Sequence, residues 1–254
     1  MFGDRLMNAE LTSGDHFAEV NPGDPLYRDL QLRGYNRRFV GTPDSVFVVD
    51  DTDQVVNAVD AVVASGKKLA VRSGGHCVEG FVDDPAVQCV IDLGQMDSVY
   101  YDRHRRAFAV EAGATLGRVY QALDMSWGVT LPGGSCTGVG MGGHVTGGGF
   151  GPLTRLYGHL SDHLYAVETV VVDENGKAKA VTATREEDDP HVICGGRTPV
   201  AVVGISVWQR NSGSVAEMGR ATTRHYFCRS GLPATRWPPL CGVGRTSTKR
   251  TSPR

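Results

Sequence analysis

The sequence predicts a mixed α+β fold, and three kinds of pattern support this prediction. Short apolar runs, typical of buried strands, alternate with segments whose apolar residues recur at the spacing of an amphipathic helix. The pair Asn175-Gly176 lies between two strand-like runs and predicts a two-residue hairpin turn. Two glycine-rich stretches, at residues 72–77 and 132–144, lie between the regular elements. With 254 residues, 41% of them hydrophobic, the chain can bury a sizeable core in one large domain or two small ones.

The N-terminal arm comprises residues 1–38, which are polar and rich in turns. We expect at most a short helix in this arm, near Tyr27–Arg33. Regular structure is expected to begin at Val46, within a domain that spans residues 39–190.

The elements of this domain follow from the strand and helix periodicities. Asp51 or Thr52 can cap the first helix, and Gly66 can end it in the left-handed conformation. The first strand, the first helix and the second strand have the lengths of one βαβ unit. In chain order, the predicted elements are a strand at Val46–Val49, a helix through the valines of residues 55–63, strands at Leu69–Arg72, Val90–Leu93 and Phe108–Glu111, a helix at Thr115–Met125, and strands at Leu164–Val172 and Ala178–Ala183.

Each glycine-rich stretch combines a backbone that can approach an anion closely with one nucleophilic side chain. The first stretch contains His76 and the second contains Cys136. Successive amides in such turns suit a pyrophosphate, whereas a packed core has little use for so many glycines. A lone loop histidine usually serves as a hydrogen-bonding residue, and a lone cysteine usually serves as a small buried hydrophobe. Their joint placement in two anion-binding loops instead favours a cofactor that is held by amides and attached covalently.

Three other kinds of site have weaker support. The run Gly138–Gly143 matches G-x-G-x-x-G, which would serve a nicotinamide-dependent dehydrogenase. This match is weak, because the stretch reads as a long wrapping loop through Gly151 and not as a strand followed by a long helix. His159 and His163 have the spacing of two metal ligands on a helix, but the glutamate of H-E-x-x-H is missing, so we expect no metal site. The sequence contains no G-K-[ST], which excludes a P-loop.

The composition changes after Pro190. Residues 191–254 contain ten lysines and arginines but a single acidic residue, Glu217, and they show no sustained period beyond Asn211. These properties predict a disordered basic tail, and no nucleic-acid-binding motif accompanies the charge. The sequence has neither a run of about 20 apolar residues nor a signal peptide. We therefore expect a cytoplasmic protein without a membrane partner.

The glycine-rich motifs give the chain a resemblance to the FAD-linked oxidases of the vanillyl-alcohol-oxidase superfamily, which have a PCMH-type FAD-binding domain. The motifs are Val71–His76, the stretch from Pro132 through Cys136 to His144, and Gly147–Gly151. Within the superfamily the chain is similar to the berberine-bridge-enzyme-like branch, and there to the hexose and oligosaccharide oxidases that tailor bacterial glycopeptide and polyketide antibiotics. The resemblance covers roughly Asp24 to Asp189 and implies a PCMH-type FAD-binding domain of two α/β subdomains.

The resemblance also implies a bicovalent FAD. His76 would bond to the flavin 8α-methyl group and Cys136 to flavin C6, and their separation of 60 positions suits the bicovalent members. The implied reaction transfers hydride from a substrate CH–OH to flavin N5, after which O2 reoxidises the flavin and becomes H2O2. The implied substrate is a small sugar or alcohol, or a glycosylated natural product, with no nucleic-acid partner. The implied cofactor-binding residues are Arg72, Ser73, Gly74, Gly75, His76, Cys77, Pro132, Gly133, Cys136, Gly138, Gly140, Gly142, Gly143, His144, Gly148 and Gly149.

The chain departs from this family after its acidic turn at residues 186–189. The family continues with a Trp-Trp segment, a glycine run and Asn-Phe-Gly-Val, and then with a substrate domain and a C-terminal base, none of which is found in this sequence. Codons exist for Val192 to Ser214 that encode the missing motifs, in order, in a shifted register. We therefore expect the reading frame to break near His191, so that residues 191–254 are an out-of-frame tail, the substrate domain is missing and no catalytic residue is identified. The expected product is an oxidase fragment with weak or no turnover, or a non-catalytic flavin-binding module.

Overall fold

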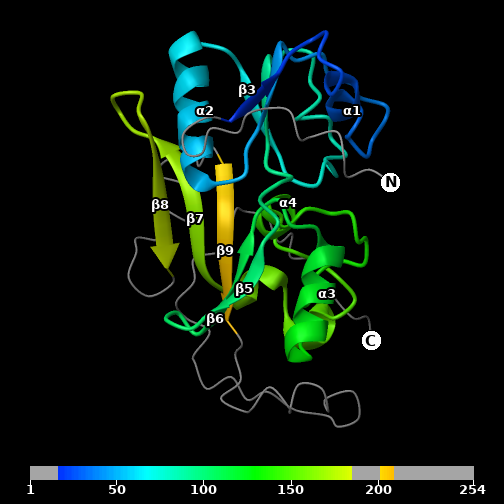
Figure 1. Cartoon of the computed structure of the whole chain (residues 1–254). Coiled ribbons are helices and arrows are strands. Elements are labelled where there is room, and N and C mark those ends of the chain that lie inside the picture. The colour runs from blue at the N-terminus through cyan, green and yellow to red at the C-terminus, as the bar shows by residue number, and fades with distance from the viewer. Residues whose placement is uncertain (1–16, 185–200, 209–254) are drawn as a thin grey trace, which may run out of the picture. The chain divides into compact units, whose positions relative to one another are not determined.

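The computed structural model describes residues 17–184 and 201–208, which form two β-sheets with helices packed on them (Figure 1). The first sheet has the strand order β1-β2-β4-β3, and the second has the order β5-β6-β9-β7-β8. The strands are β1 Ala18–Val20, β2 Ser45–Val48, β3 Leu69–Arg72, β4 Cys89–Asp92, β5 Val99–Asp102, β6 Ala107–Glu111, β7 Leu164–Val172, β8 Ala178–Thr184 and β9 Ala201–Trp208. The helices are α1 Tyr27–Gln31, α2 Thr52–Ser65, α3 Leu116–Trp127, α4 Met141–Thr146, α5 Thr154–Tyr157 and the 3-10 turn η1 Leu160–His163. The mixed α+β class that the sequence predicts is confirmed.

The first sheet contains the predicted strand–helix–strand unit. Strands β2, β4 and β3 run parallel, and β4 lies between the other two. Helix α2 begins at one of the two predicted caps, where the side chain of Asp51 accepts a hydrogen bond of 2.7 Å from the amide of Gln54. The helix ends at Gly66, whose φ is +67°, the left-handed conformation that glycine adopts without strain.

The N-terminal arm is part of the first sheet, so the prediction that regular structure begins at Val46 is wrong. Strand β1 pairs antiparallel with β2, and the ring of Phe17 packs edge-on against that of Phe47 with centroids 4.8 Å apart. Helix α1 lies within the predicted segment Tyr27–Arg33. A strand of three residues is too short for a period to be visible in the sequence. Residues 1–16 of the arm lie outside the described residues.

The second sheet contains a strand from the segment that the sequence analysis assigned to a tail. Strand β9 lies antiparallel between β6 and β7, and alternate residues along it (Val203, Ile205 and Val207) are buried. The prediction of a disordered tail over residues 191–254 is therefore wrong for Ala201–Trp208. The composition of the whole segment 191–254 drew attention away from the alternation of apolar residues over these eight positions. The remaining residues of that segment lie outside the described part of the chain.

The hairpin between β7 and β8 is one residue longer than predicted. The amide of Asp173 donates to the carbonyl of Lys177 over 2.8 Å, which leaves three residues in the loop. Gly176 has φ +76°, whereas Asn175 has no positive φ, and a two-residue type I′ turn would need it at both positions. The loop therefore has the features of a three-residue hairpin with glycine in the left-handed position.

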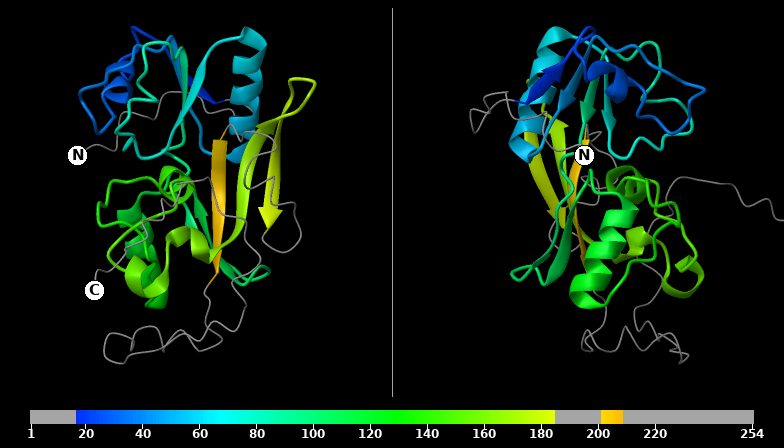
Figure 2. Two further views of the ribbon diagram at one scale, coloured as in Figure 1. Left: turned by 180° about the vertical axis from the view of Figure 1, so that it is seen from behind. Right: turned by 45° about the vertical axis from the view of Figure 1, so that its right-hand side comes forward.

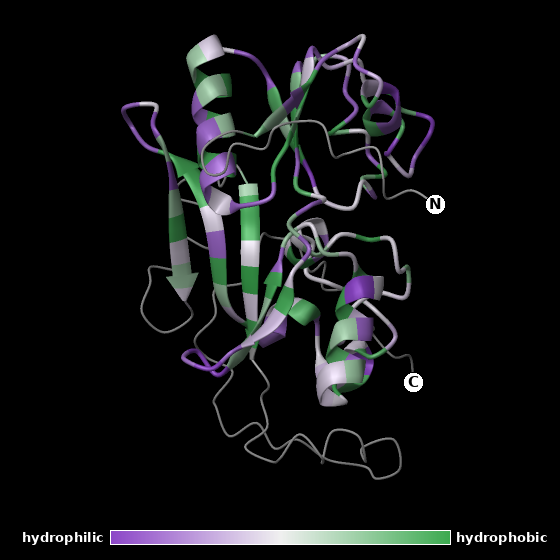
Figure 3. Cartoon of the chain, viewed as in Figure 1, coloured by the Kyte–Doolittle hydropathy of each residue, from purple (hydrophilic) through white to green (hydrophobic). Residues whose placement is uncertain are grey.

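The core consists of two main apolar clusters. In the first, α2 packs with β2 and β4 of one sheet and with β7 and β9 of the other. In the second, α3 and α4 pack with β6 and β9. Figure 2 shows α2 beside β7 and β8 in both views, and Figure 3 shows that β9 is hydrophobic along most of its length. These packed elements carry the loops that follow β3 and α3, which are the two glycine-rich stretches.

Candidate functional site

The two glycine-rich loops contact each other backbone to backbone. A Cβ atom at Gly74 would lie 2.3 Å from the backbone nitrogen of Gly140, and one at Gly140 would lie 2.1 Å from the backbone nitrogen of Gly74. Both distances are too short for any side chain. The close approach of the two loops therefore requires glycine at both positions.

The structure brings the two predicted nucleophiles together. The Sγ atom of Cys136 lies 4.0 Å from Nδ1 of His76. Cys136 is exposed and His76 is partly exposed. Gly138 makes room for the histidine, since a Cβ atom there would lie 2.8 Å from Nε2 of His76. An imidazole and a thiol thus share one accessible surface, where both can react with the same bound molecule.

The N-terminal arm contributes an aromatic ring to this surface, which the sequence analysis did not identify. The ring of Tyr35 stacks on the imidazole of His76 with centroids 4.5 Å apart and planes inclined by 16°. The amide of Tyr35 also donates to the carbonyl of Gly75 over 2.7 Å. The arm is therefore fixed to the first glycine loop, although nothing local in the sequence around Tyr35 indicates this contact.

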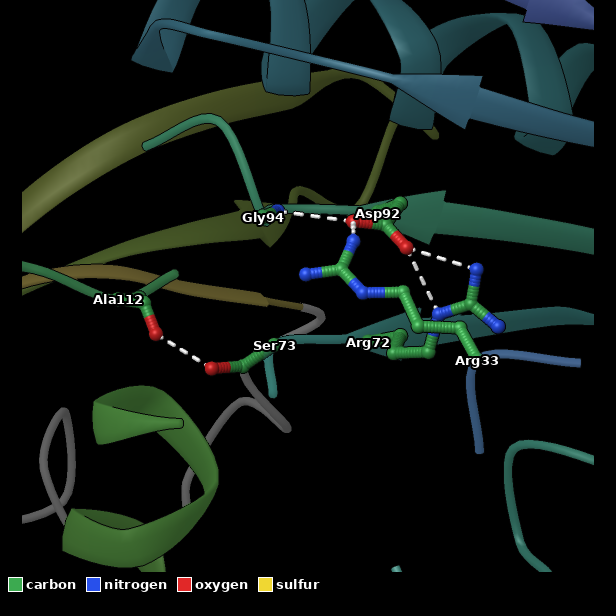
Figure 4. A network of polar contacts seen from close by, with 6 residues as sticks. All are labelled: Arg33, Arg72, Ser73, Asp92, Gly94 and Ala112. Atoms are coloured by element: carbon green, nitrogen blue, oxygen red, sulfur yellow. Dashed lines mark hydrogen bonds and ion pairs between the residues drawn. The ribbon is translucent and has the colours of Figure 1, made fainter. Parts of the chain in front are cut away.

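A buried ion-pair network lies beneath the first glycine loop (Figure 4). Arg72 and Asp92 are register partners at the carboxyl ends of β3 and β4, and their side chains are 3% and 1% exposed. The Nε atom of Arg72 donates to Oδ2 of Asp92 over 2.7 Å, while Arg33 and the amide of Gly94 bind Oδ1. Sequence reasoning missed Arg33, Asp92 and Gly94, although an aspartate that ends an apolar strand is a visible signal.

The ion pair with Asp92 holds the guanidinium group of Arg72 in a buried position beneath the first glycine loop. Its Nη2 atom lies 2.7 Å from Oδ2 of Asp92, but this geometry is that of an ion pair and not of a hydrogen bond. The buried Nη2 atom therefore has no hydrogen-bond partner among the described residues. The next residue, Ser73, donates from its hydroxyl to the carbonyl of Ala112 over 2.5 Å, as Figure 4 shows.

The second glycine-rich stretch contains helix α4, so its description as one long wrapping loop is wrong. The first amides of α4 donate to carbonyls of a distant segment: Met141 to Ala114 over 2.8 Å, and Gly142 to Ala112 over 2.9 Å. The helix has only six residues and follows a loop, and both facts disfavour a Rossmann-type nicotinamide site at Gly138–Gly143.

The other predicted binding residues differ in their exposure to solvent and in the space around them. Gly143 is exposed, and a Cβ atom added to Gly143 or Gly148 would lie more than 4 Å from every described atom outside its chain neighbours and its own helix backbone. Gly149 has φ +70° and packs on Leu160, which makes it a structural glycine. The remaining members are half-buried or buried; they are Cys77, Pro132, Gly133 and Gly142.

His144 and Tyr120 bind the backbone that precedes Cys136. The amide of Gly134 donates to Nε2 of His144 over 3.0 Å, and the hydroxyl of Tyr120 donates to the carbonyl of Gly134 over 2.6 Å. Burial lowers the pKa of His144 and raises the pKa of Tyr120, so both groups are held neutral. The sequence analysis had assigned His144 to the cofactor, whereas here its ring nitrogen bonds to a peptide.

The two histidines that were considered as metal ligands do not lie on an α-helix. His159 precedes the 3-10 turn η1 and His163 is its last residue; a ring nitrogen of His163 bonds to the carbonyl of Tyr157 at 2.9 Å, and the amide of His159 donates to Asp162 over 2.8 Å. Within the described ranges, no three histidine, cysteine or acidic side chains gather as they would around a metal ion. The same residues include no helix with the length and apolar character of a membrane span.

The arrangement fits a dinucleotide cofactor with a reactive planar ring. The exposed backbone at Gly143 in α4 suits a phosphate group, and the buried Arg72 keeps a positive charge close beneath the first loop. The accessible pair His76 and Cys136 places two nucleophilic side chains on the same surface.

Comparison with known proteins places these features in a wider context. A family model described as "FAD binding domain" matches residues 43–182. The aclacinomycin-N/aclacinomycin-A oxidase of Streptomyces galilaeus is 50% identical over 232 residues, which are 91% of this chain and 40% of that protein. The hexose oxidase of Chondrus crispus is 36% identical over 220 residues, which are 82% of this chain and 37% of that protein.

Solved structures show the same fold. The crystal structure of a glycopeptide hexose oxidase complexed with teicoplanin matches with a TM-score of 0.74 and 45% sequence identity, covering 80% of this chain and 42% of that chain. The crystal structure of aclacinomycin oxidoreductase matches with the same TM-score, 0.74, and 50% identity. The chain spans about two fifths of the length of the relatives that it matches.

Proposed function

Because the chain belongs to the FAD binding domain family, we propose that it is the FAD-binding part of an oxidase that acts on an alcohol carbon of a sugar or of a glycosylated natural product. The family, the fold class and the use of FAD agree with the resemblance that the sequence motifs indicate. The choice of substrate class rests on the names of the relatives, which include a hexose oxidase, an aclacinomycin oxidase and a glycopeptide hexose oxidase with teicoplanin.

The observation that carries this proposal is the meeting of His76 and Cys136 at 4.0 Å. The two residues come from different loops and lie 60 positions apart in the sequence, and the two loops meet backbone to backbone at Gly74 and Gly140. Two nucleophiles at this distance can bond to two positions of one planar ring system. We therefore propose that His76 is linked to the flavin 8α-methyl group and Cys136 to flavin C6.

The other residues of the site would hold the cofactor in place. The amides of Ser73–Gly75 and the exposed backbone at Gly143 would bind the phosphates, while Arg72 and Asp92 keep the end of β3 fixed beneath them. When bound, FAD supplies the redox chemistry: it accepts a hydride from the alcohol carbon, and O2 reoxidises it. We propose that the catalytic base and the substrate pocket belong to the part of the relatives' length that this chain does not span.

Each proposed link would consume one molecule of O2. At His76, a C–N bond would form between a ring nitrogen and the 8α-methyl carbon, with loss of one N–H proton, one C–H proton and two electrons. At Cys136, a C–S bond would form between Sγ and C6, with loss of the S–H and C6–H protons and two electrons. In each case O2 would take up the two protons and two electrons and leave as H2O2, so that atoms and electrons balance.

Denaturation of the FAD-loaded chain tests the links. Flavin is expected to stay with the acid-precipitated, washed protein in wild type, in His76→Ala and in Cys136→Ala, because one link remains in each single variant. The double variant is expected to lose it, and peptide masses should place the remaining flavin on the unmutated residue. His104→Ala is a matched control, since His104 is an exposed histidine on the β5–β6 turn.

Three outcomes would contradict covalent attachment at these two residues. Covalent flavin in the double variant would place the links elsewhere. Flavin that washes out of wild type would favour a non-covalent flavin-binding module. A colourless protein that binds NAD would favour the nicotinamide-dependent dehydrogenase.

The frame break near His191 remains a proposal of its own. It is supported by the order of the shifted-register motifs, which match the family's continuation. The match to the Streptomyces galilaeus oxidase covers 91% of the chain and so extends past residue 190, a fact that any frame break has to accommodate. Sequencing the gene through codon 191 decides the question: a missing or extra base is expected, and an uninterrupted frame would overturn the proposal.

A further inference from the structure

We propose that Tyr120 and His144 act as positioning residues for Cys136, because together they bind the backbone C=O and N–H of Gly134. The proposal concerns the conformation of this chain's own loop. It rests on the proposed function only where the flavin link at Cys136 serves as a readout.

Two hydrogen bonds to the backbone of Gly134, one from Tyr120 and one to His144, form a two-sided clamp. The N–H of Gly134 donates to Nε2 of His144 over 3.0 Å, and its C=O accepts from the hydroxyl of Tyr120 over 2.6 Å. His144 belongs to α4 and Tyr120 to α3, so the backbone of Gly134 is bound to two separate packed helices. Both polar groups of one glycine are thus satisfied by side chains, two residues before Cys136.

The backbone after Cys136 is also hydrogen-bonded, in this case to the first amides of α3. The amide of Gly117 donates to the carbonyl of Thr137, and the amide of Leu116 donates to the carbonyl of Val139, both over 2.9 Å. These amides lie in the first helical turn and have no partner within the helix. Cys136 therefore lies in a short span between two anchors, and α3 contributes to both of them.

The side chain of Cys136 needs this support because it has little of its own. It is exposed, and its one described polar contact is the 4.0 Å approach to His76. A loop left free on one side would let the thiol move relative to the imidazole. The clamp keeps the two nucleophiles at a separation that a single ring system can bridge.

The residue types of the clamp match this role. Only the unprotonated Nε2 of His144 can accept from Gly134, and burial lowers the pKa of His144, which favours that form. Gly133 leaves space for the other side of the clamp, because a Cβ atom there would lie 2.6 Å from the hydroxyl of Tyr120.

Four variants test the proposal in the full 254-residue chain. Tyr120→Phe removes only the donor, and His144→Leu removes only the acceptor. His144→Gln keeps an acceptor at a similar reach. Tyr27→Phe is the matched control, because the hydroxyl of Tyr27 donates to a backbone carbonyl, that of Pro43, over 2.7 Å and away from the clamp.

The first readout is hydrogen exchange in the chain without FAD. Amides of the segment 134–137 are expected to exchange about fivefold faster or more in Tyr120→Phe and His144→Leu, as expected for the loss of one hydrogen bond. His144→Gln and Tyr27→Phe are expected to exchange at the wild-type rate. Unchanged exchange in both Tyr120→Phe and His144→Leu would overturn the proposal.

The second readout separates positioning from general loosening of the fold. After loading with FAD, peptide mapping is expected to show a selective loss of the flavin link at Cys136, with the link at His76 retained and with rescue by His144→Gln. An equal fall of both links without rescue would contradict a positioning role. If wild type carries no link at Cys136, the proposed covalent function fails, and the exchange experiment alone then decides whether the clamp holds the loop.

Discussion

Asp92→Ala is expected to lower the free energy of unfolding by about 3–5 kcal/mol, the range observed when one partner of a buried ion pair is removed. The carboxylate of Asp92 is 1% exposed and binds both Arg33 and Arg72. Its removal would leave the buried guanidinium of Arg72 without any counter-charge in this network. The loss should reach the first glycine loop directly, because Ser73 follows Arg72 in the chain.

Urea denaturation followed by circular dichroism measures this effect. Asp97→Ala is the matched control, since Asp97 forms an ion pair with Arg118 at 3.8 Å in which both side chains are more than half exposed. Such surface pairs contribute about 0–1 kcal/mol. Equal losses in the two variants would show that the network beneath the loop does not carry the stability assigned to it.

Gly140→Ala is expected to separate the two glycine-rich loops, whereas Gly143→Ala is expected to be tolerated. The added methyl group at Gly140 would lie 2.0 Å from the hydroxyl of Ser73 and 2.1 Å from the amide of Gly74. Neither backbone can retreat cheaply, so we expect a loss of about 3 kcal/mol, at the upper end of the cost of overpacking. At Gly143, an added methyl group would lie more than 4 Å from every described atom outside its chain neighbours and its own helix backbone, and alanine favours the helix by up to about 1 kcal/mol.

Thermal unfolding and FAD retention measure both variants. Gly140→Ala should lower Tm and the fraction of the chain that takes up FAD, while Gly143→Ala should keep Tm at or above the wild-type value. A Gly140→Ala protein that melts and binds FAD like wild type would contradict the close contact between the loops.

The paired nucleophiles could be predicted because their signals are local. Each of His76 and Cys136 lies inside its own glycine run, and the run itself reports the close approach of a backbone. Their contact joins residues 60 positions apart, and the family resemblance supplied that pairing where the residues alone left it open. The strands and helices with several turns or clear periods, such as α2 and β7, were visible for the same local reason.

Other features depend on contacts that no local pattern encodes. Helix α4 contains two adjacent glycines, each of which costs about 1 kcal/mol relative to alanine, so its sequence disfavours a helix. It forms because Ala112 and Ala114 accept hydrogen bonds from its first amides. The ion pair between Arg33 and Asp92 joins residues 59 positions apart, and β1 has only three residues. Such features become visible only once the fold brings distant segments together.

The position of β9 has a consequence for how the chain acquires its fold during synthesis. Strands β6 and β7 emerge from the ribosome first, but the strand that joins them is encoded by residues 201–208. The β7–β8 hairpin can form early, whereas the insertion of β9 is a late, non-local step, which slows folding. Until then β6 and β7 each present an unpaired edge, and such edges promote association between chains. The yield of folded protein therefore depends on how soon β9 pairs with β6 and β7, or on chaperones that cover the two unpaired edges until it does.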